Sequence, residues 1–209
     1  MELVILGSGV CVPNKGRSPA GYLLKTDDSL LLLDSGSGTM RQIEKAGYDF
    51  MKITTLIYSH THPDHVSDLI PILQGMVLQS ESFGPERSDP LLIYGPRGFE
   101  ALYRTLRDLF LSDPEPYPVL IRELYEHTLQ MGNLMLTSKP VLHSSHLTCL
   151  GYRIECQGKT IAYSGDSGMC ETLVELCRNV DLAILDCSYP KGYPSGSHLG
   201  VLGCGEVAE

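Results

Sequence analysis

The sequence predicts an α/β fold, because apolar strand segments alternate with segments of helical periodicity. A β-branched, apolar run at 53–58 has the composition of a buried strand, and residues 66–78 carry apolar side chains at helical spacing. Two other segments repeat this order. They are the leucines at 30–33 before a helix from Met40, and a strand at 91–94 before a helix at 98–111.

The rest of the chain adds more strands and two helices. Polar, proline-containing segments at 80–90 and 113–118 predict loops. Residues 119–142 are expected to form strands, with His127 on a surface turn. The other expected elements are two or three strands within 2–33, strands at 150–155, 159–163 and 181–186, and helices at 171–177 and 205–209.

Length and composition predict one domain spanning residues 1–209. The chain is 43% hydrophobic and 20% charged, as globular proteins are, and it contains no apolar run of about 18 residues that could span a membrane. The seven cysteines are scattered and form no Cys-x-x-Cys pair, which favours the reducing cytoplasm. A net charge of −9 disfavours a broad nucleic-acid-binding face.

The segment with the strongest chemical signal follows the strand at 53–58. It places His60, His62, Asp64 and His65 within six residues, on the loop that leads to the helix at 66–78. Neutral imidazole suits zinc, and a carboxylate suits harder divalent ions or a shared site. This set can begin two adjacent metal sites more readily than it can complete one. His60 and His62 would bind one metal, and Asp64 and His65, beyond the bend at Pro63, would face a second.

The pattern His60-x-His62-x-Asp64-His65, between a buried strand and a helix, resembles the metallo-β-lactamase superfamily. Other stretches resemble its ribonuclease Z and phosphodiesterase branch. That branch has a Pro-x-Lys-x-Arg-Asn element, which Pro13, Lys15 and Arg17 match and from which Ser18 departs. The resemblance implies a four-layer αββα sandwich of two mixed β-sheets flanked by helices, with a two-metal hydrolytic site at one edge.

The resemblance also implies roles for residues at other strand ends. Asp34 matches an aspartate that orients a metal-bound histidine, although it could instead cap the helix from Met40. His143 matches the third histidine of the first metal, with His146 as the alternative. Asp166, in a Gly-Asp pair after a strand, matches a ligand that bridges both metals, since a carboxylate lowers the repulsion between two cations.

The implied reaction is hydrolysis of a phosphodiester by a hydroxide that two divalent metal ions share. Zinc is the expected metal and manganese the alternative. Asp64 is expected to serve in catalysis as well as in binding metal, and His198 would protonate the leaving oxygen with Asp186 as its acidic partner. Other superfamily reactions on thioesters, lactones or sulfate esters remain alternatives, as does a non-catalytic metal-binding module.

The expected substrate is a small phosphodiester or a related ester, and a homodimer is compatible with the sequence. Ribonuclease Z grips tRNA with a long arm between two strands that correspond here to 151–155 and 160–163. Only residues 156–159 join these strands, so tRNA is disfavoured. In the family, one more strand, ending in a histidine, follows the helix at the end of this sequence. We therefore expect the domain to lack that strand and the second metal to bind more weakly.

Overall fold

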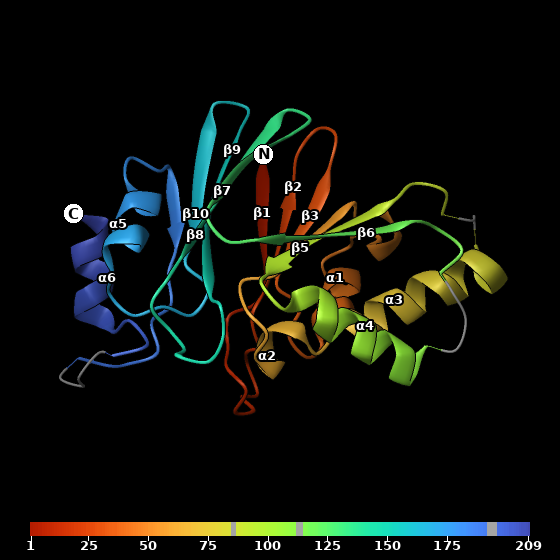
Figure 1. Ribbon diagram of the computed structural model, residues 1–209, viewed down its shortest axis with the longest axis horizontal. Helices are drawn as coiled ribbons and strands as arrows, with labels where there is room; N and C mark the ends of the chain where they lie inside the picture. Colours follow the sequence, from red (N-terminus) through yellow and green to blue (C-terminus); the bar gives the residue numbers. More distant parts are fainter. Residues whose placement is uncertain (85–86, 112–114, 192–195) are drawn as a thin grey trace. The chain divides into compact units, whose positions relative to one another are not determined.

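The computed structural model describes residues 1–84, 87–111, 115–191 and 196–209, arranged in two compact units, Met1–Glu123 and Leu124–Glu209 (Figure 1). Each unit contains a mixed β-sheet and helices that pack on it. The predicted α/β class is therefore confirmed. The predicted linker at 113–118 and loop at 80–90 lie partly outside the described residues.

The first unit is built on a six-stranded sheet in which the strands lie in chain order, β1 to β6. β1, β2 and β3 pair antiparallel, whereas β3, β4 and β5 pair parallel. In the parallel part, Leu33 lies opposite Ile57, so the carboxyl ends of β3 and β4 meet at one edge of the sheet. The strands are β1 (Glu2–Gly7), β2 (Gly21–Lys25), β3 (Leu30–Leu33), β4 (Thr55–Ile57), β5 (Leu91–Pro96) and β6 (Val119–Leu124).

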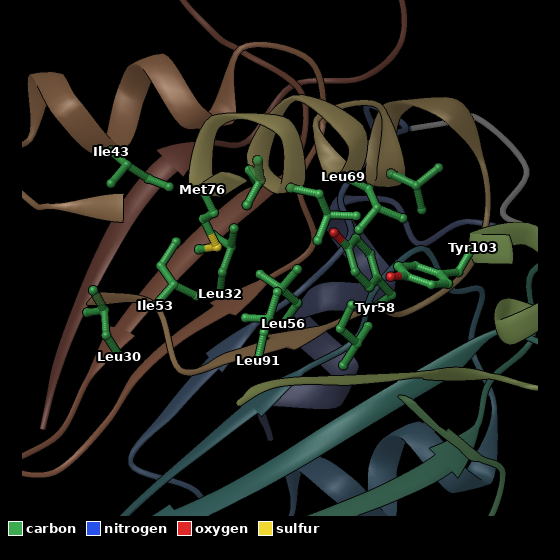
Figure 2. Packing of buried hydrophobic residues seen from close by; sticks show 14 of the residues in the cluster. Leu30, Leu32, Ile43, Ile53, Leu56, Tyr58, Leu69, Met76, Leu91 and Tyr103 are labelled. Atoms are coloured by element: carbon green, nitrogen blue, oxygen red, sulfur yellow. The ribbon is translucent and has the colours of Figure 1, made fainter. Parts of the chain in front are cut away.

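The helices of the first unit cover its apolar core. Ile43 of α1, five residues of α3 and two of α4 pack with strand side chains in one cluster. Figure 2 shows part of this cluster, with side chains such as Ile43, Leu69 and Met76 between helices and sheet. Met76 and Leu56 are fully buried there, which stabilises the unit by about 2 kcal/mol for each such side chain. The helices are α1 (Thr39–Lys45), α2 (Pro63–Val66), α3 (Leu69–Leu78) and α4 (Phe99–Phe110), with the short η1 (Phe50–Lys52) and η2 (Gln79–Phe83).

The second unit is built on a five-stranded sheet of order β11-β10-β9-β8-β7. β7 to β10 form an antiparallel meander, and β11 pairs parallel to β10. The turn between β9 and β10 has Gln157 and Gly158 in the left-handed region, the geometry of a tight two-residue hairpin, as expected. The strands are β7 (His127–Met131), β8 (Leu134–Pro140), β9 (Leu150–Cys156), β10 (Lys159–Tyr163) and β11 (Leu182–Ile184).

Two helices complete this unit, the first packed on β8, β9 and β10 and the second packed on the first. α5 (Glu171–Cys177) and α6 (Val201–Ala208) bury Leu173, Val207 and the loop residue Leu199 in a cluster with Ala162 of β10. Because β8, β10 and β11 run in the same direction, their carboxyl ends lie at one edge. The segments that follow these three strands therefore start from the same edge.

Four details differ from the sequence predictions. β8 ends at Pro140, so His143 lies in the loop three residues later and not at the end of the strand. His127 is exposed but is the first residue of β7, where the prediction put a surface turn. The chain after α3 continues as the π-helix η2 where a loop was expected, and α6 begins at Val201, ahead of the predicted start. For β8 the reason is the ladder with β9, which stops at Pro140, and the ends of helices are set only to within one or two residues by local signals.

Within residues 1–84, 87–111, 115–191 and 196–209, no helix combines the length and the apolar character needed to cross a lipid bilayer.

Gly36 allows the loop after β3 to pack closely on α2. A β-carbon at position 36 would lie 2.1 Å from the carbonyl oxygen of Asp64 and 2.6 Å from the β-carbon of Pro19. The Gly36 amide also donates a hydrogen bond to the carbonyl oxygen of Ala20 at 2.9 Å. The backbone of Gly36 therefore lies between Asp64 and the 19–20 segment, and neither neighbour leaves space for a β-carbon.

We expect Gly36→Ala to lower the free energy of unfolding by about 3 kcal/mol, because overpacking against backbone atoms forces the loop apart. Urea-induced unfolding measures the change. Gly16→Ala is the matched control, since its β-carbon would meet only the Asn14 side-chain oxygen, at 3.6 Å. If Gly36→Ala were as stable as the control, the close packing of the loop after β3 on Asp64 and Pro19 would be contradicted.

Candidate functional site

The first set of candidate residues is organised by the carboxylate of Asp34. This residue follows β3 in the left-handed region, at φ 52°, which aspartate tolerates better than most residues. The residue is 1% exposed. Oδ1 accepts a hydrogen bond from the Ser59 amide, and Oδ2 accepts one from the Ser59 hydroxyl and one from Nδ1 of His65, each at 2.7 Å. Asp34 therefore holds the loop after β4, and the N-cap of α1 is Gly38 instead.

These hydrogen bonds set the protonation pattern of two imidazoles. His65 donates from Nδ1 to Asp34, so its Nε2 carries the lone pair. The Ser59 hydroxyl donates to Asp34 and lies 3.0 Å from Nδ1 of His60. The one proton of the Ser59 hydroxyl is donated to Asp34, so in the contact with His60 the ring nitrogen Nδ1 is the donor. The Nε2 atom of a neutral His60 therefore carries a lone pair. One carboxylate thus prepares both rings to accept a cation.

Two pairs of side-chain nitrogen and oxygen atoms lie close together in this loop. Nε2 of His60 and Nδ1 of His62 lie 2.9 Å apart, and Nε2 of His65 and Oδ2 of Asp64 lie 4.0 Å apart. Two donors that bind one tetrahedral zinc ion at about 2.1 Å each lie about 3.4 Å apart. The 2.9 Å and 4.0 Å separations lie on either side of this value, and His60 and His65 are buried. The pairing of these donors on two metal ions stays a prediction.

A second layer of hydrogen bonds fixes this loop to the start of α1. The amide of Ser35 donates to the His65 carbonyl at 2.7 Å, and the amide of Asp68 donates to the Ser35 carbonyl at 2.8 Å. The Asp68 carboxylate accepts hydrogen bonds from the amides of Gly38 and Met40 at 3.0 and 2.8 Å. These bonds tie the C-terminal end of α2 to the loop after β3.

Tyr58 contributes to the same hydrogen-bond network through its hydroxyl group. Its hydroxyl lies 2.7 Å from the Ser35 hydroxyl, and its ring stacks on Phe99 at 4.7 Å between centroids. Burial raises the pKa of Tyr58, so the phenol stays neutral. Tyr58 is thus a structural partner of the loop and not a titrating group at neutral pH.

The second set of candidates lies in the second unit, beyond the carboxyl ends of β8, β10 and β11. His143 follows β8, Asp166 follows β10, and Asp186 follows β11. Nε2 of His143 lies 3.7 Å from Oδ2 of Asp166, and the rings of His143 and His198 are 4.6 Å apart. Asp166, Asp186 and His198 also offer ligand atoms within 4.8 Å of one another. The fold of this unit thus brings all four predicted residues together.

Asp186 and His198 form a hydrogen-bonded pair. Nδ1 of His198 lies 2.7 Å from Oδ2 of Asp186, whose side chain is 4% exposed. Oδ2 also accepts a hydrogen bond from the Ser167 amide at 3.2 Å, and Oδ1 accepts one from the Ser188 hydroxyl at 2.6 Å. This arrangement holds the proton of a neutral His198 on Nδ1 and leaves Nε2 to exchange protons.

The alternative ligand His146 is placed differently from His143. Its side chain is exposed, and its backbone amide donates to the Ser144 hydroxyl at 3.1 Å. By contrast, Nδ1 of His143 lies 3.1 Å from the Ser197 carbonyl oxygen, in the orientation that leaves Nε2 toward Asp166. The geometry favours His143, and its role as a ligand stays a prediction.

Three cysteines of the second unit have raised pKa values. Burial raises the pKa of Cys149 and of Cys177 to about 11. Burial, assisted by Cys187 and Asp186, raises the pKa of Cys204 to about 12, and its thiol contacts the Asp186 carbonyl oxygen at 3.2 Å. These groups are neutral thiols near pH 7.

Two serines in these networks were missed in the sequence analysis. Ser59 links Asp34 to His60, and Ser188 contacts both Asp186 and His198. Ser59 precedes the histidine motif directly and Ser188 follows Asp186 by two residues, so proximity to the motifs was the one signal available. Serine is too common in loops for that signal to decide a role.

Comparisons with known proteins agree with this fold and these residues. A family model described as a beta-lactamase superfamily domain matches residues 30–209, and the chain belongs to that family. It is 26% identical over 236 aligned residues to ribonuclease Z of Methanosarcina acetivorans, with 90% of this chain and 75% of the relative covered. The predicted resemblance to the ribonuclease Z branch is therefore confirmed.

Two solved structures share the fold. The metallo-β-lactamase fold protein YhfI of Bacillus subtilis superposes with a TM-score of 0.80 at 24% identity, covering 99% of this chain and 80% of that one. The short form of human tRNase Z gives a TM-score of 0.86 at 22% identity, covering 100% of this chain and 88% of that one. At these identities the likeness establishes the fold alone, and it confirms the predicted metallo-β-lactamase fold.

We expect Asp34→Asn to reverse the tautomer of His65 while the protein stays folded. The asparagine oxygen would keep the Ser59 amide, so its NH₂ group would donate to Nδ1 of His65 and move the ring proton to Nε2. Nitrogen-15 NMR of labelled histidine, recorded where the rings are neutral, measures the change. Asp28→Asn, at an exposed position in the turn between β2 and β3, is the control. A His65 ring that kept its proton on Nδ1 would contradict the assignment.

Proposed function

We propose that this protein is a metal-dependent hydrolase of phosphodiesters. The observation that carries the proposal is the Asp186–His198 pair beside Asp166, with the ring nitrogen Nδ1 of His198 fixed by a carboxylate at 2.7 Å. A phosphodiester releases an alkoxide, which needs a proton as the bond to phosphorus breaks. The similarity to ribonuclease Z, named as an enzyme that acts on RNA, supports the same bond type.

We assign the metal ligands to the two sets described above. His60 and His62 would hold one divalent ion and Asp64 with His65 would contact a second, while His143 and Asp166 supply further ligands. Zinc is the proposed metal because imidazole dominates the first pair, and manganese is the alternative because carboxylates contribute to the rest. When bound, such ions would activate water and neutralise charge on the phosphoryl oxygens.

The chain's own residues would deliver and hold the proton. In the protonated His198, Nδ1–H stays bonded to Asp186 and Nε2–H faces outward as the acid. As water adds to phosphorus and releases one proton to the solvent, the bond to the leaving oxygen breaks and that oxygen takes the Nε2 proton. The ring then regains a proton from the solvent. Asp186 remains ionised throughout and keeps the imidazole in one orientation. Asp64, beside His65, would orient the attacking water as well as bind metal.

A small phosphodiester is the proposed substrate rather than precursor tRNA. The hairpin between β9 and β10 turns within two residues, so an arm like that of ribonuclease Z is missing from this described segment. The net charge of −9 also opposes broad contact with a polyanion. Both features favour a small substrate, and neither bears on which type of bond is hydrolysed.

We expect metal-loaded protein to hydrolyse bis(p-nitrophenyl) phosphate faster than the β-lactam nitrocefin, a thioester, a lactone or an aryl sulfate. Initial rates under one set of conditions measure this order, and a precursor tRNA at physiological salt completes the comparison. Nitrocefin turnover equal to or above that of the phosphodiester would sink the proposal. Tight metal binding without turnover of any ester would indicate the non-catalytic module instead. Efficient cleavage of the tRNA would keep the chemistry and overturn the proposed substrate size.

We expect His62→Ala and His143→Ala to lose bound metal, because each removes an imidazole nitrogen from a small ligand set. His146→Ala and His127→Ala should retain it, since both side chains are exposed. Elemental analysis by inductively coupled plasma mass spectrometry, after dialysis against low metal, gives the metal content per chain. Loss of metal from His146→Ala but not from His143→Ala would show that the third ligand has been misassigned.

A further inference from the structure

Ser188 lies between the two residues of the proposed acid pair. It follows Asp186 by two residues, and its backbone amide donates a hydrogen bond to the carbonyl oxygen of Leu199 at 3.0 Å. Leu199 is fully buried among residues of α5 and α6, and it is the chain neighbour of His198. The backbone at Ser188 is therefore fixed relative to both Asp186 and His198.

The Ser188 hydroxyl contacts both side chains. It donates to Oδ1 of Asp186 at 2.6 Å and lies 3.4 Å from Nδ1 of His198. Since its proton points to Asp186, it can receive only a minor share of the Nδ1 proton, whose main acceptor is Oδ2 at 2.7 Å. The hydroxyl thus fixes the plane of the carboxylate, so that Oδ2 faces the ring.

The contacts described for the Asp186 carboxylate are divided between its two oxygens. Oδ2 accepts a hydrogen bond from the Ser167 amide at 3.2 Å and faces Nδ1 of His198, whereas Oδ1 accepts one from the Ser188 hydroxyl. A carboxylate turns about its Cβ–Cγ bond, so a hydrogen bond to each oxygen resists the rotation, and the contact from Ser188 is the shortest of the three, at 2.6 Å. Hydrogen bonds to charged acceptors are the stronger ones, and a short O–H···O⁻ contact is directional. The position of His198 depends on the carboxylate that Ser188 orients.

We propose that Ser188 is a positioning residue for proton delivery by His198. This inference rests on the proposed function, because it assigns Ser188 a part in the same hydrolysis. Ser188 acts through Asp186 and has no contact with the reacting atoms. Its effect should therefore depend on how much the leaving oxygen needs a proton: large for an alkoxide, and small for p-nitrophenolate, which leaves without assistance.

The kinetic test compares two phosphodiesters that differ in their leaving group, p-nitrophenolate and a simple alkoxide. We expect Ser188→Ala to lower kcat about tenfold for the alkyl ester and less than twofold for the p-nitrophenyl ester, with KM unchanged for both. Ser188→Thr should restore the rate, because it keeps the hydroxyl and residue 188 is exposed enough to place the methyl group in solvent. Exposed Ser88→Ala is the matched control. An equal loss on both esters, or a loss that Ser188→Thr does not restore, would overturn the proposal.

A second measurement separates this inference from the proposed function. Nitrogen-15 NMR of labelled histidine in the metal-free protein reports the tautomer of neutral His198, independently of any turnover. We expect the wild type to hold the proton on Nδ1 and Ser188→Ala to show a mixture of both tautomers. An unchanged tautomer in Ser188→Ala would refute the positioning role even if the enzyme is active. A mixture in a protein without phosphodiesterase activity would support that role and reject the proposed function alone.

Discussion

The buried carboxylate of Asp34 is the constraint on which the histidine loop depends. Removing an ionised carboxylate from water costs several kcal/mol unless hydrogen bonds replace its hydration. Asp34 has three such partners, two from Ser59 and one from His65. The parallel pairing of β3 with β4 places these partners within reach, and the left-handed backbone at Asp34 aims the carboxylate at them. The fold and the protonation of the imidazoles are thus coupled through one side chain.

The second unit uses the same chemical arrangement with different residues. A buried aspartate at a strand end, Asp186, binds a histidine, and a serine hydroxyl completes the contact, as Ser59 does for Asp34. In both units the aspartate follows a parallel strand, where side chains gather at one sheet edge. The repeated arrangement explains why histidines on flexible-looking loops can have defined orientations: the carboxylates hold them, and the strands hold the carboxylates.

The fold class and most of the candidate site residues could be predicted from the sequence, because the patterns that indicate them are local. The histidine motif and the strands beside it are continuous in the chain, and the family resemblance followed from them. The serines could not be predicted, since Ser59 acts on a residue 25 positions earlier in the chain, and such a partner is visible only after folding. The predicted end of β8, at His143, was wrong because strand pairing also depends on residues distant in the chain. Local composition gives strand character through His143, whereas the ladder with β9 stops at Pro140.

The turn between β9 and β10 has a consequence for how proteins of this fold diversify. Gln157 and Gly158 lie at the tip of a hairpin whose register is set by the pairs below it, from Cys156 with Lys159 to Tyr152 with Tyr163. Segments can be added at such a tip without shifting a single strand pair, because the ladder and the strand ends are fixed independently. A segment that binds a large partner can therefore be added at this turn or removed from it, while Asp166, which follows Tyr163, keeps its position.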